Sequence, residues 1–401
     1  MDRLTNTVRP YPWGSATALP QLMGLAPDGT PQAELWMGAH PAAPSYAERT
    51  GRLEALDKVV AADPRGELGD WVVDRFGSRL PFLLKLLAAD APLSLQVHPD
   101  ADQAAAGFAR EEERGVPLDA PHRSYRDPHH KPEMIVALGP FEGLCGFRAP
   151  GASADLLETL GVAGLAPYVE MLRSGRPEEQ ALREVFTGFL SAGPDLVDDV
   201  TDALARSARE GGERAALFDV YHRIARAHPG DAGVPAALLV RHVRLSPGEA
   251  LFLGAGVPHA YVRGLGVEIM AASDNVLRCG LTDKHVDVAE LLRVVRFEAV
   301  PVRPSGPVFG PGGEDLYPAP VDDFRLSRVR VRTGGEVAAQ ALGGRGPQIL
   351  VCTEGAVRLR GPQDDVLLTA GRSVYARHGE RIAVSGEGTV FRATVPVPPV
   401  N

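Results

Sequence analysis

The 401-residue chain contains only three cysteines, Cys145, Cys279 and Cys352, and they lie far apart in the sequence. No CxxC pair occurs, so we expect neither a disulfide framework nor a metal site built from thiolates. Such sparse cysteine is typical of proteins that work in a reducing compartment. The sequence therefore predicts a cytoplasmic protein.

The chain also lacks any run of 18 apolar residues, and its first six residues contain no apolar core of a signal peptide. We therefore expect neither a membrane-spanning helix nor secretion by the usual signal. Positive charge is not in excess, because the formal net charge is −9 at pH 7. This charge argues against a surface that binds nucleic acids or anionic membranes in general. A phosphorylated substrate would therefore need a local cluster of Lys and Arg.

The residue patterns that are present divide the chain into three zones. Residues 1–150 show strand-like runs, and the run 93–98 alternates apolar and polar residues. Residues 151–235 have helical periodicity. The clearest apolar stripe in this zone consists of Leu182, Val185, Phe186, Phe189 and Leu190. From residue 236 onward strands return, and we expect them at 237–240, 245–253, 349–352, 356–359 and 366–368.

A short internal echo links the two strand-rich zones. Leu245-x-x-Gly248-x-x-x-Phe252 recurs as Leu368-x-x-Gly371-x-x-x-Tyr375. The spacing suits a strand, a turn centred on glycine and a second strand, as in a jelly-roll barrel. It gives moderate support to a duplication.

Four chemistry-bearing residues stand in three separate motifs. Gln96 and His98 lie two apart on an expected strand and so project from one face. Glu133 follows His129-His130-Lys131-Pro132 at the start of an apolar run, and His259 ends a turn before another strand. Each motif alone is more often a solvent-facing loop or strand residue.

Taken together, Gln96, His98, Glu133 and His259 offer one amide, two imidazoles and one carboxylate. This donor set suits Zn²⁺, and suits Fe²⁺ or Mn²⁺ somewhat less well. One carboxylate would leave the metal a formal charge of +1, which suits a Lewis acid that polarises a carbonyl or hydroxyl oxygen.

A fourth segment, residues 268–282, is dense in polar groups yet flanked by apolar ones. Its Arg278 has the planar guanidinium that binds phosphate or stabilises an oxyanion. The structural alternative is an ion pair between Arg278 and Asp274 or Asp283.

In these motifs the sequence resembles the type I mannose-6-phosphate isomerases, a zinc-dependent cupin family. The blocks that carry the resemblance follow in family order over the first 300 residues: Tyr11-Pro12-Trp13-Gly14, Ala33-Glu34-Leu35-Trp36-Met37-Gly38, Gln96-Val97-His98-Pro99-Asp100, His130-Lys131-Pro132-Glu133, Pro258-His259-Ala260-Tyr261 and Ser273-Asp274-Asn275 through Arg278. The last hundred residues match only loosely.

The resemblance implies a fold, a cofactor and a reaction. The fold would be mainly β with an α insertion: two cupin-type jelly-roll barrels plus a helical domain. Residues 1–150 and 236–300 would form the catalytic cupin domain, 151–235 the helical insertion, and 301–401 a cupin-like domain without metal, whose lone His378 lacks partners. The reaction would be the reversible interconversion of mannose 6-phosphate and fructose 6-phosphate by a monomer holding one Zn²⁺.

The resemblance also implies residue roles. Gln96, His98, Glu133 and His259 would bind zinc, and Arg278 would be catalytic. The residues expected to line the substrate pocket are Lys85, Ser94, Lys131, Tyr261, Glu268 and Asp274. Departures are modest: Ala101 stands where many members carry lysine, and Asp283 and His285 stand where proline and an aromatic residue are commoner.

The sequence leaves the proton carrier open between Glu268, if burial raises its pKa, and Lys131, if a nearby cation lowers its pKa. Two other functions use the same fold. A cupin oxygenase with Fe²⁺ at the four ligands would not explain the Lys and Arg cluster. A non-catalytic cupin that binds sugar phosphates could lack Arg278 or a metal ligand, and none of these residues is missing here.

Overall fold

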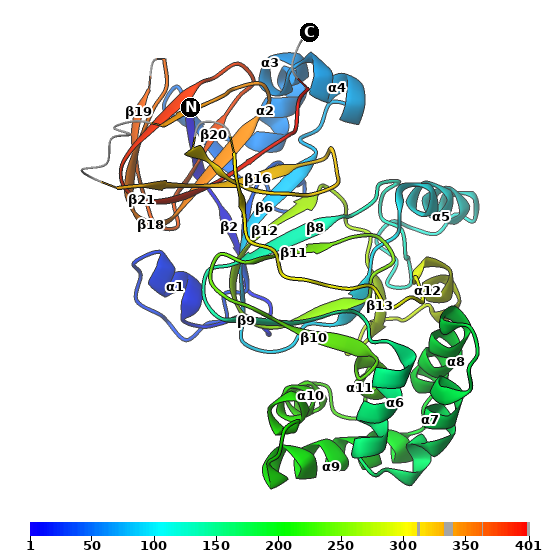
Figure 1. Ribbon diagram of the computed structural model, residues 1–401. Helices are drawn as coiled ribbons and strands as arrows, with labels where there is room; N and C mark the ends of the chain where they lie inside the picture. The colour runs from blue at the N-terminus through cyan, green and yellow to red at the C-terminus, as the bar shows by residue number, and fades with distance from the viewer. Residues whose placement is uncertain (311–312, 333–339, 363, 399–401) are drawn as a thin grey trace.

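The computed structural model describes residues 1–310, 313–332, 340–362 and 364–398. Over these residues the chain forms two large antiparallel sheets and a helical region (Figure 1). The second sheet and the helical region lie at opposite ends of the molecule, with the first sheet between them. No helix in the described ranges is long and apolar enough to cross a membrane.

The first sheet contains most of the predicted site residues. Its strands in the described part of the chain are β2 (Thr7–Arg9), β3 (Glu34–Met37), β6 (Phe82–Ala89), β7 (Leu95–Val97), β8 (Glu133–Ala137), β9 (Phe141–Phe147), β10 (Val240–Leu245), β11 (Ala250–Leu253), β12 (His259–Ala271) and β13 (Leu277–Gly280). The order is β10-β9-β12-β6-β3-β2, with β11 pairing β8, β8 pairing β12, and β7 pairing both β12 and β13.

Strand β12 connects the two halves of this sheet. Its first residues pair with β7 and β9, and its later residues pair with β6 and β8. The register shifts between Tyr261 and Arg263, and Gly264 follows with φ of +135°. A Cβ at Gly264 would lie 2.8 Å from the Cα of Phe141, so this bend requires glycine.

The second sheet is built from both ends of the chain. Its strands in the described ranges are β1 (Asp2–Thr5), β4 (Tyr46–Arg49), β5 (Arg52–Ala55), β14 (Val308–Phe309), β15 (Asp315–Tyr317), β16 (Arg325–Val331), β17 (Gln340–Leu342), β18 (Gln348–Arg360), β19 (Asp365–Thr369), β20 (Ser373–Ala376) and β21 (Ile382–Thr394). Strand β1 pairs with β20 and β4, so residues 2–5 and 46–55 join strands of the C-terminal hundred residues. The predicted sequence ranges therefore do not correspond one-to-one with the sheets.

The echo in the sequence corresponds to similar local structure. Gly248 lies between β10 and β11 with φ of +87°, and Gly371 lies between β19 and β20 with φ of +78°. Both are turns that favour glycine because an L side chain rarely adopts this conformation. Each half of the echo is thus a strand, a glycine turn and a strand, as predicted.

Two strand predictions were wrong in detail. Residues 237–239 lie at and just beyond the end of a helix, and the strand begins only at Val240. The runs 349–352 and 356–359 belong to one continuous strand, β18, which absorbs a register shift between Cys352 and Glu354. Gly355, which directly follows the shift, has φ of +70°, a conformation that favours glycine.

The helical region follows β9 and returns to β10. Its helices are α6 (Pro150–Thr159), η1 (Ala163–Leu165), α7 (Ala166–Arg173), α8 (Glu178–Leu190), α9 (Pro194–Glu210), α10 (Ala215–Ala227) and α11 (Gly233–Ala237). The predicted stripe on α8 is buried at Leu182, Val185, Phe186 and Phe189. These side chains share one core with Leu95 and Val97 of β7, so the helices support the strand that precedes His98.

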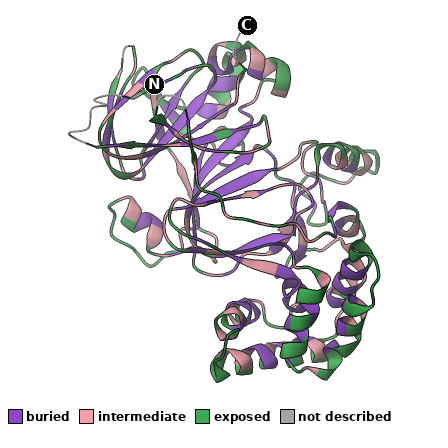
Figure 2. Cartoon of the chain, viewed as in Figure 1, coloured by how far each residue is buried: buried purple, intermediate pink, exposed green. Residues whose placement is uncertain are grey.

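The two sheets also share a core. Buried side chains of β6 and β12, such as Leu84 and Ile269, pack in one cluster with Ile349, Val351 and Phe391 of the second sheet. Figure 2 shows the strands between the two ends as largely buried, whereas the outer faces of the helices are exposed. The remaining helices are α1 (Ala18–Leu22), α2 (Leu56–Ala62), α3 (Pro64–Leu68), α4 (Asp70–Phe76), α5 (Ala101–Glu113) and α12 (Val288–Val294).

Candidate metal centre and surrounding pocket

Three of the four predicted metal ligands lie together in the first sheet. His98 directly follows β7, Glu133 begins β8 and His259 begins β12. The candidate ligand atoms of these three residues all lie within 4.8 Å of one another, and the side chains are buried. Nε2 of His98 is 3.3 Å from Oε2 of Glu133, and Nε2 of His259 is 3.1 Å from Oε1.

Both imidazoles are oriented by backbone carbonyl groups. Nδ1 of His98 lies 2.9 Å from the carbonyl oxygen of Asn275, and Nδ1 of His259 lies 2.9 Å from that of Val257. A carbonyl oxygen can only accept, so Nδ1 carries the proton in each ring and Nε2 presents a lone pair. Burial lowers the pKa of His98 to about 4, which keeps its ring neutral.

Three atoms that converge at this centre have no hydrogen-bond partners. Nε2 of His98, Nε2 of His259 and Oε1 of Glu133 are buried, and none has a hydrogen-bond partner. Three acceptors that face one another without a proton to share are costly unless a cation lies between them. Two imidazoles and a carboxylate, with carbonyl groups behind the imidazoles, therefore fit a divalent metal of the zinc type.

The local backbone holds the two histidines in place. The N–H of Gly256 donates to the carbonyl oxygen of His98 at 2.9 Å, which joins the turn before His259 to the segment after β7. After His98, Asp100 caps α5: its side chain accepts from the N–H of Gln103, and the Gln103 side chain accepts from the N–H of Asp100. This capping box stops the strand and starts the helix just beyond the ligand.

The fourth predicted ligand, Gln96, lies on β7 beside the centre. Its Cα is paired with that of His259 on β12 and with that of Arg278 on β13. Directly opposed residues on neighbouring strands have close Cβ atoms and share a face of the sheet. Gln96 is half-buried, and its role as a ligand stays a prediction.

A buried ionic cluster lies on the neighbouring strands. Nζ of Lys85 on β6 lies 2.9 Å from Oε2 of Glu268 on β12 and 3.4 Å from Oε1 of Glu34 on β3. Nε1 of Trp36 donates to Glu34 at 2.7 Å, and the Lys85 ammonium lies 5.3 Å from the centre of the Trp36 ring. Burial raises the pKa of Glu268 while Lys85 opposes that rise. The pKa of Lys85 is raised, because its two carboxylate partners outweigh burial.

Tyr261 lies on β12 with His259, and Ser94 directly precedes β7. Tyr261 is two residues after His259 on β12, so both side chains project from one face. Burial and the charges of Glu268 and Glu133 raise the pKa of Tyr261 well above its usual range. Ser94 is half-buried and precedes Gln96 by two residues.

Arg278 and Lys131 are half-buried cations without ion-pair partners among the described residues. The structural alternative for Arg278, an ion pair with Asp274 or Asp283, does not form there. Burial and the nearby Arg126 lower the pKa of Arg278. Burial and Arg278 in turn lower that of Lys284. Arg278, Arg126 and Lys284 form a local positive region of the kind that the sequence requires for a phosphorylated substrate.

Asp274 is exposed and paired with a residue that the sequence analysis did not single out. Nε2 of His40 lies 3.1 Å from both carboxylate oxygens of Asp274, and the His40 ring packs edge-on against Trp36. Partial desolvation of the carboxylate acts to raise its pKa, but the hydrogen bond and the charge of His40 act to lower it, and the pKa of Asp274 is lowered. Neither His40 nor Glu34 was predicted as a site residue, although Glu34 lies within the block 33–38 and His40 follows it closely.

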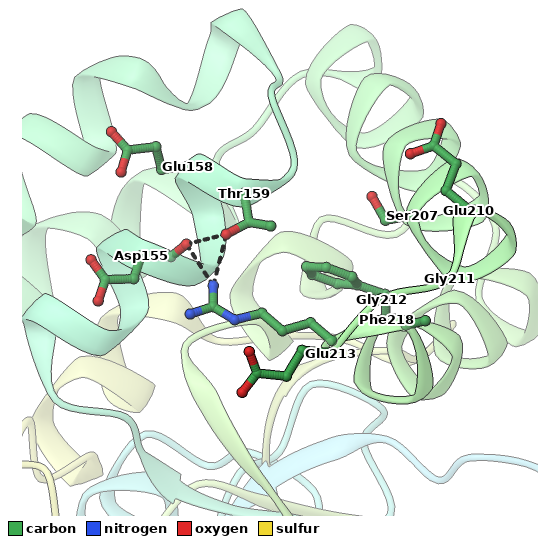
Figure 3. Close-up of a pocket in the computed structure, with 11 residues that line it drawn as sticks. Asp155, Glu158, Thr159, Ser207, Glu210, Gly211, Gly212, Glu213 and Phe218 are labelled. Carbon is green, nitrogen blue, oxygen red and sulfur yellow. Dashed lines mark hydrogen bonds between the residues drawn. The ribbon is translucent and has the colours of Figure 1, made fainter.

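A separate cavity of about 540 Å³ lies in the helical region, away from these residues (Figure 3). Its walls come from α6, from the end of α9 and from the start of α10. The Arg214 guanidinium donates to Oγ1 of Thr159 at 2.7 Å and to the carbonyl oxygen of Asp155 at 2.9 Å. No predicted site residue lines this cavity, so it is not part of the metal centre.

The fold and the buried donor set define the class of protein: an enzyme with a metal centre in an antiparallel sheet. The family profile "Phosphomannose isomerase type I, catalytic domain" matches residues 1–150. Mannose-6-phosphate isomerase of Escherichia coli K12 is 38% identical over 397 residues, covering 98% of this chain and 99% of that protein. The enzyme of Schizosaccharomyces pombe is 32% identical, covering 94% of both.

Solved structures give the same result. A zinc-bound mannose 6-phosphate isomerase superposes with a TM-score of 0.90 at 35% identity, over 99% of each chain. Another, bound with zinc and yttrium, superposes with a TM-score of 0.89 at 36% identity, over 99% of this chain and all of that one. This chain belongs to the type I phosphomannose isomerase family.

Proposed function

We propose that this chain interconverts mannose 6-phosphate and fructose 6-phosphate, using one Zn²⁺ held at the centre formed by His98, Glu133 and His259. The observation that carries the proposal is the convergence of three buried acceptor atoms that have no donor among them. The full-length similarity to mannose-6-phosphate isomerases supports the substrate and the reaction.

The metal would be held by Nε2 of both histidines and by Glu133, with the Gln96 amide as the fourth ligand. Zinc bound there supplies a Lewis acid that polarises an oxygen of the sugar. The carbonyl groups of Asn275 and Val257 keep each Nε2 directed at the metal, because they fix the tautomer and the ring orientation.

The reaction transfers a proton from C2 of the aldose to C1 through an enediol, and a base must carry that proton. We assign this role to Glu268. Burial raises its pKa, and the ammonium of Lys85 at 2.9 Å opposes that rise. A carboxylate with a raised pKa is a stronger base than an ordinary carboxylate, which suits it to proton transfer.

The cations around the centre bind and stabilise negative charge. Lys131 is near enough to oppose protonation of His98 and to lower the pKa values of Glu133 and Asp274. Arg278 lies opposite Gln96 in the sheet and is free to bind the phosphate or the developing oxyanion. Ser94, Tyr261 and Asp274 would contact the sugar.

The finer architecture is part of the same proposal. The glycine turns at Gly248 and Gly371 support two cupin-type jelly-roll units, related by duplication. The catalytic unit would comprise residues 1–150 and 236–300, with 151–235 inserted and 301–401 as a metal-free unit, although β1, β4 and β5 pair with the second unit.

The setting of the protein is part of the same proposal. The three converging ligand residues belong to a single chain, in keeping with a monomer as the working unit. The three cysteines are free and buried, which supports the cytoplasm as the compartment.

The test is the conversion of mannose 6-phosphate to fructose 6-phosphate by the purified protein, read by a coupled assay, with oxygen uptake followed in parallel. We expect fructose 6-phosphate without oxygen consumption. Oxygen consumption that requires Fe²⁺, without sugar isomerisation, would assign the chain to the oxygenases instead. Binding of the sugar phosphate without turnover would assign it to the regulatory cupins.

A further inference from the structure

Asn275 lies in the loop between β12 and β13 and is fully buried. It is a neutral residue and touches no candidate ligand atom of the metal centre. Its contacts nevertheless reach two of the three segments that supply the ligands. The role that follows from these contacts rests on the proposed zinc-dependent reaction.

The first contact comes from the backbone. The carbonyl oxygen of Asn275 accepts the Nδ1 proton of His98 at 2.9 Å. This bond selects the tautomer in which Nε2 is a ligand, and it fixes the rotation of the ring. A shift of the loop would therefore turn the ligand away from the metal.

The second set of contacts comes from the side-chain amide. Oδ1 accepts from the N–H of Arg126 at 2.7 Å, and Nδ2 donates to the carbonyl oxygens of Asp127 and His129 at 2.7 and 2.8 Å. Both ends of the amide are thus used by residues 126–129. This segment leads directly to Lys131 and to the ligand Glu133 at the start of β8.

Neighbouring residues strengthen the same connection. Oγ of Ser273 donates to the carbonyl oxygen of His129 at 3.1 Å and accepts from the N–H of Asn275 at 3.2 Å. The N–H of Asp274 donates to Oδ2 of Asp127 at 2.8 Å. The loop 273–275 and the segment 126–129 are therefore joined by several hydrogen bonds, and Asn275 makes most of them.

We propose that Asn275 is a positioning residue of the metal centre, which couples the orientation of His98 to the placement of Lys131 and Glu133. Only an amide side chain combines the acceptor with the two N–H donors that the 126–129 backbone uses. An aspartate would keep the size but would turn an acceptor towards the carbonyl groups of Asp127 and His129, so the segment would move away.

The test compares the wild-type protein with Asn275→Asp and Asn275→Ala. Zinc affinity is measured by competition with a chromophoric chelator, and kcat and KM are measured at saturating zinc. Loss of a group that orients a metal ligand typically weakens binding about 10–100-fold. We expect a loss of this size in both variants. We also expect a lower kcat at saturating zinc, because Glu133 is displaced, and a higher KM, because Lys131 is displaced with it.

Asn6→Asp is the matched control, because among the described residues the Asn6 side chain bonds only Ser373 of β20 and Ser45, just before β4. It should bind zinc as the wild type does. Where Asn275→Asp does not fold, Ser273→Ala removes two of the neighbouring bonds and should show a smaller loss in the same direction.

A folded Asn275→Asp or Ser273→Ala that binds zinc within threefold of the wild type and keeps its kcat would overturn the proposal. Wild-type protein that binds no zinc would instead overturn the proposed function. The two failures are therefore distinguishable.

Discussion

Nζ of Lys85 lies 2.9 Å from Oε2 of Glu268, across the adjacent strands β6 and β12. Both side chains are buried, and Glu34 holds the other side of the ammonium group. Removing one partner of such a pair leaves a buried charge without compensation. Burial raises the pKa of Glu268, and Lys85 opposes that rise, so the pair affects how readily Glu268 can carry the proton.

We expect Glu268→Gln to lower kcat by about 10²–10⁴-fold, the usual contribution of a positioned base, with a much smaller change in KM. Lys131→Met should mainly raise KM, because the Lys131 ammonium attracts the negatively charged substrate. Steady-state kinetics of both variants are the measurement. A tenfold or smaller loss in Glu268→Gln, together with a large loss of kcat in Lys131→Met, would transfer the role to Lys131.

The pH dependence of kcat/KM should show the raised pKa of Glu268. A base must be ionised, so activity is lost as the pH falls through that pKa, above the usual glutamate value of about 4.3. Lys85→Met removes the cation that opposes the rise, and we expect its acidic limb to move to higher pH. Lys58→Met, at an exposed position, is the control and should leave the limb in place. A limb that does not move in Lys85→Met would contradict this account.

His40 is expected to act through Asp274. With His40→Ala, the carboxylate loses its 3.1 Å partner and its fixed orientation at the edge of the pocket. KM for mannose 6-phosphate should rise several-fold, whereas kcat should change by less than about twofold, because the group binds the sugar without reacting. His122→Ala, at an exposed site, should change neither constant. An unchanged KM in His40→Ala would remove Asp274 from the binding residues.

The helical region should stabilise the catalytic sheet through their shared core. Phe186 on α8 is fully buried, and its ring packs edge-on against Phe147 of β9 at 5.4 Å. Phe186→Ala should lower the free energy of unfolding by about 3–5 kcal/mol, as measured by urea denaturation. Phe309→Ala, at a residue 84% exposed, should change it by no more than about 0.5 kcal/mol. Equal effects would mean that the two regions do not share a core.

Three of the four predicted ligands, His98, Glu133 and His259, lie far apart in the chain, and the structure brings them together as a candidate metal site. Each stands in a compact motif at the boundary of a strand, whereas the role of Gln96 stays a prediction. The α8 stripe was also correct, because helical burial depends on local spacing. In both cases the relevant pattern lies within about ten residues.

Contacts that depend on sheet register were not predictable in this way. Glu34 meets Lys85 because β3 and β6 are neighbours, and His40 meets Asp274 across 234 residues. Asn275 stood in a recognised block, yet its partners at 126–129 carry no periodic pattern. The pairing of β1 with β20 joins short strands from the two ends of the chain, and four residues do not specify a partner.

The central claim is that His98, Glu133 and His259 hold a zinc ion on which turnover depends. The most direct measurement is the metal content per chain and the rate of mannose 6-phosphate isomerisation, before chelation, after chelation and after zinc is restored. We predict one zinc per chain, loss of activity when the metal is removed, and recovery when zinc is added back. Full turnover by the metal-free protein would contradict the account.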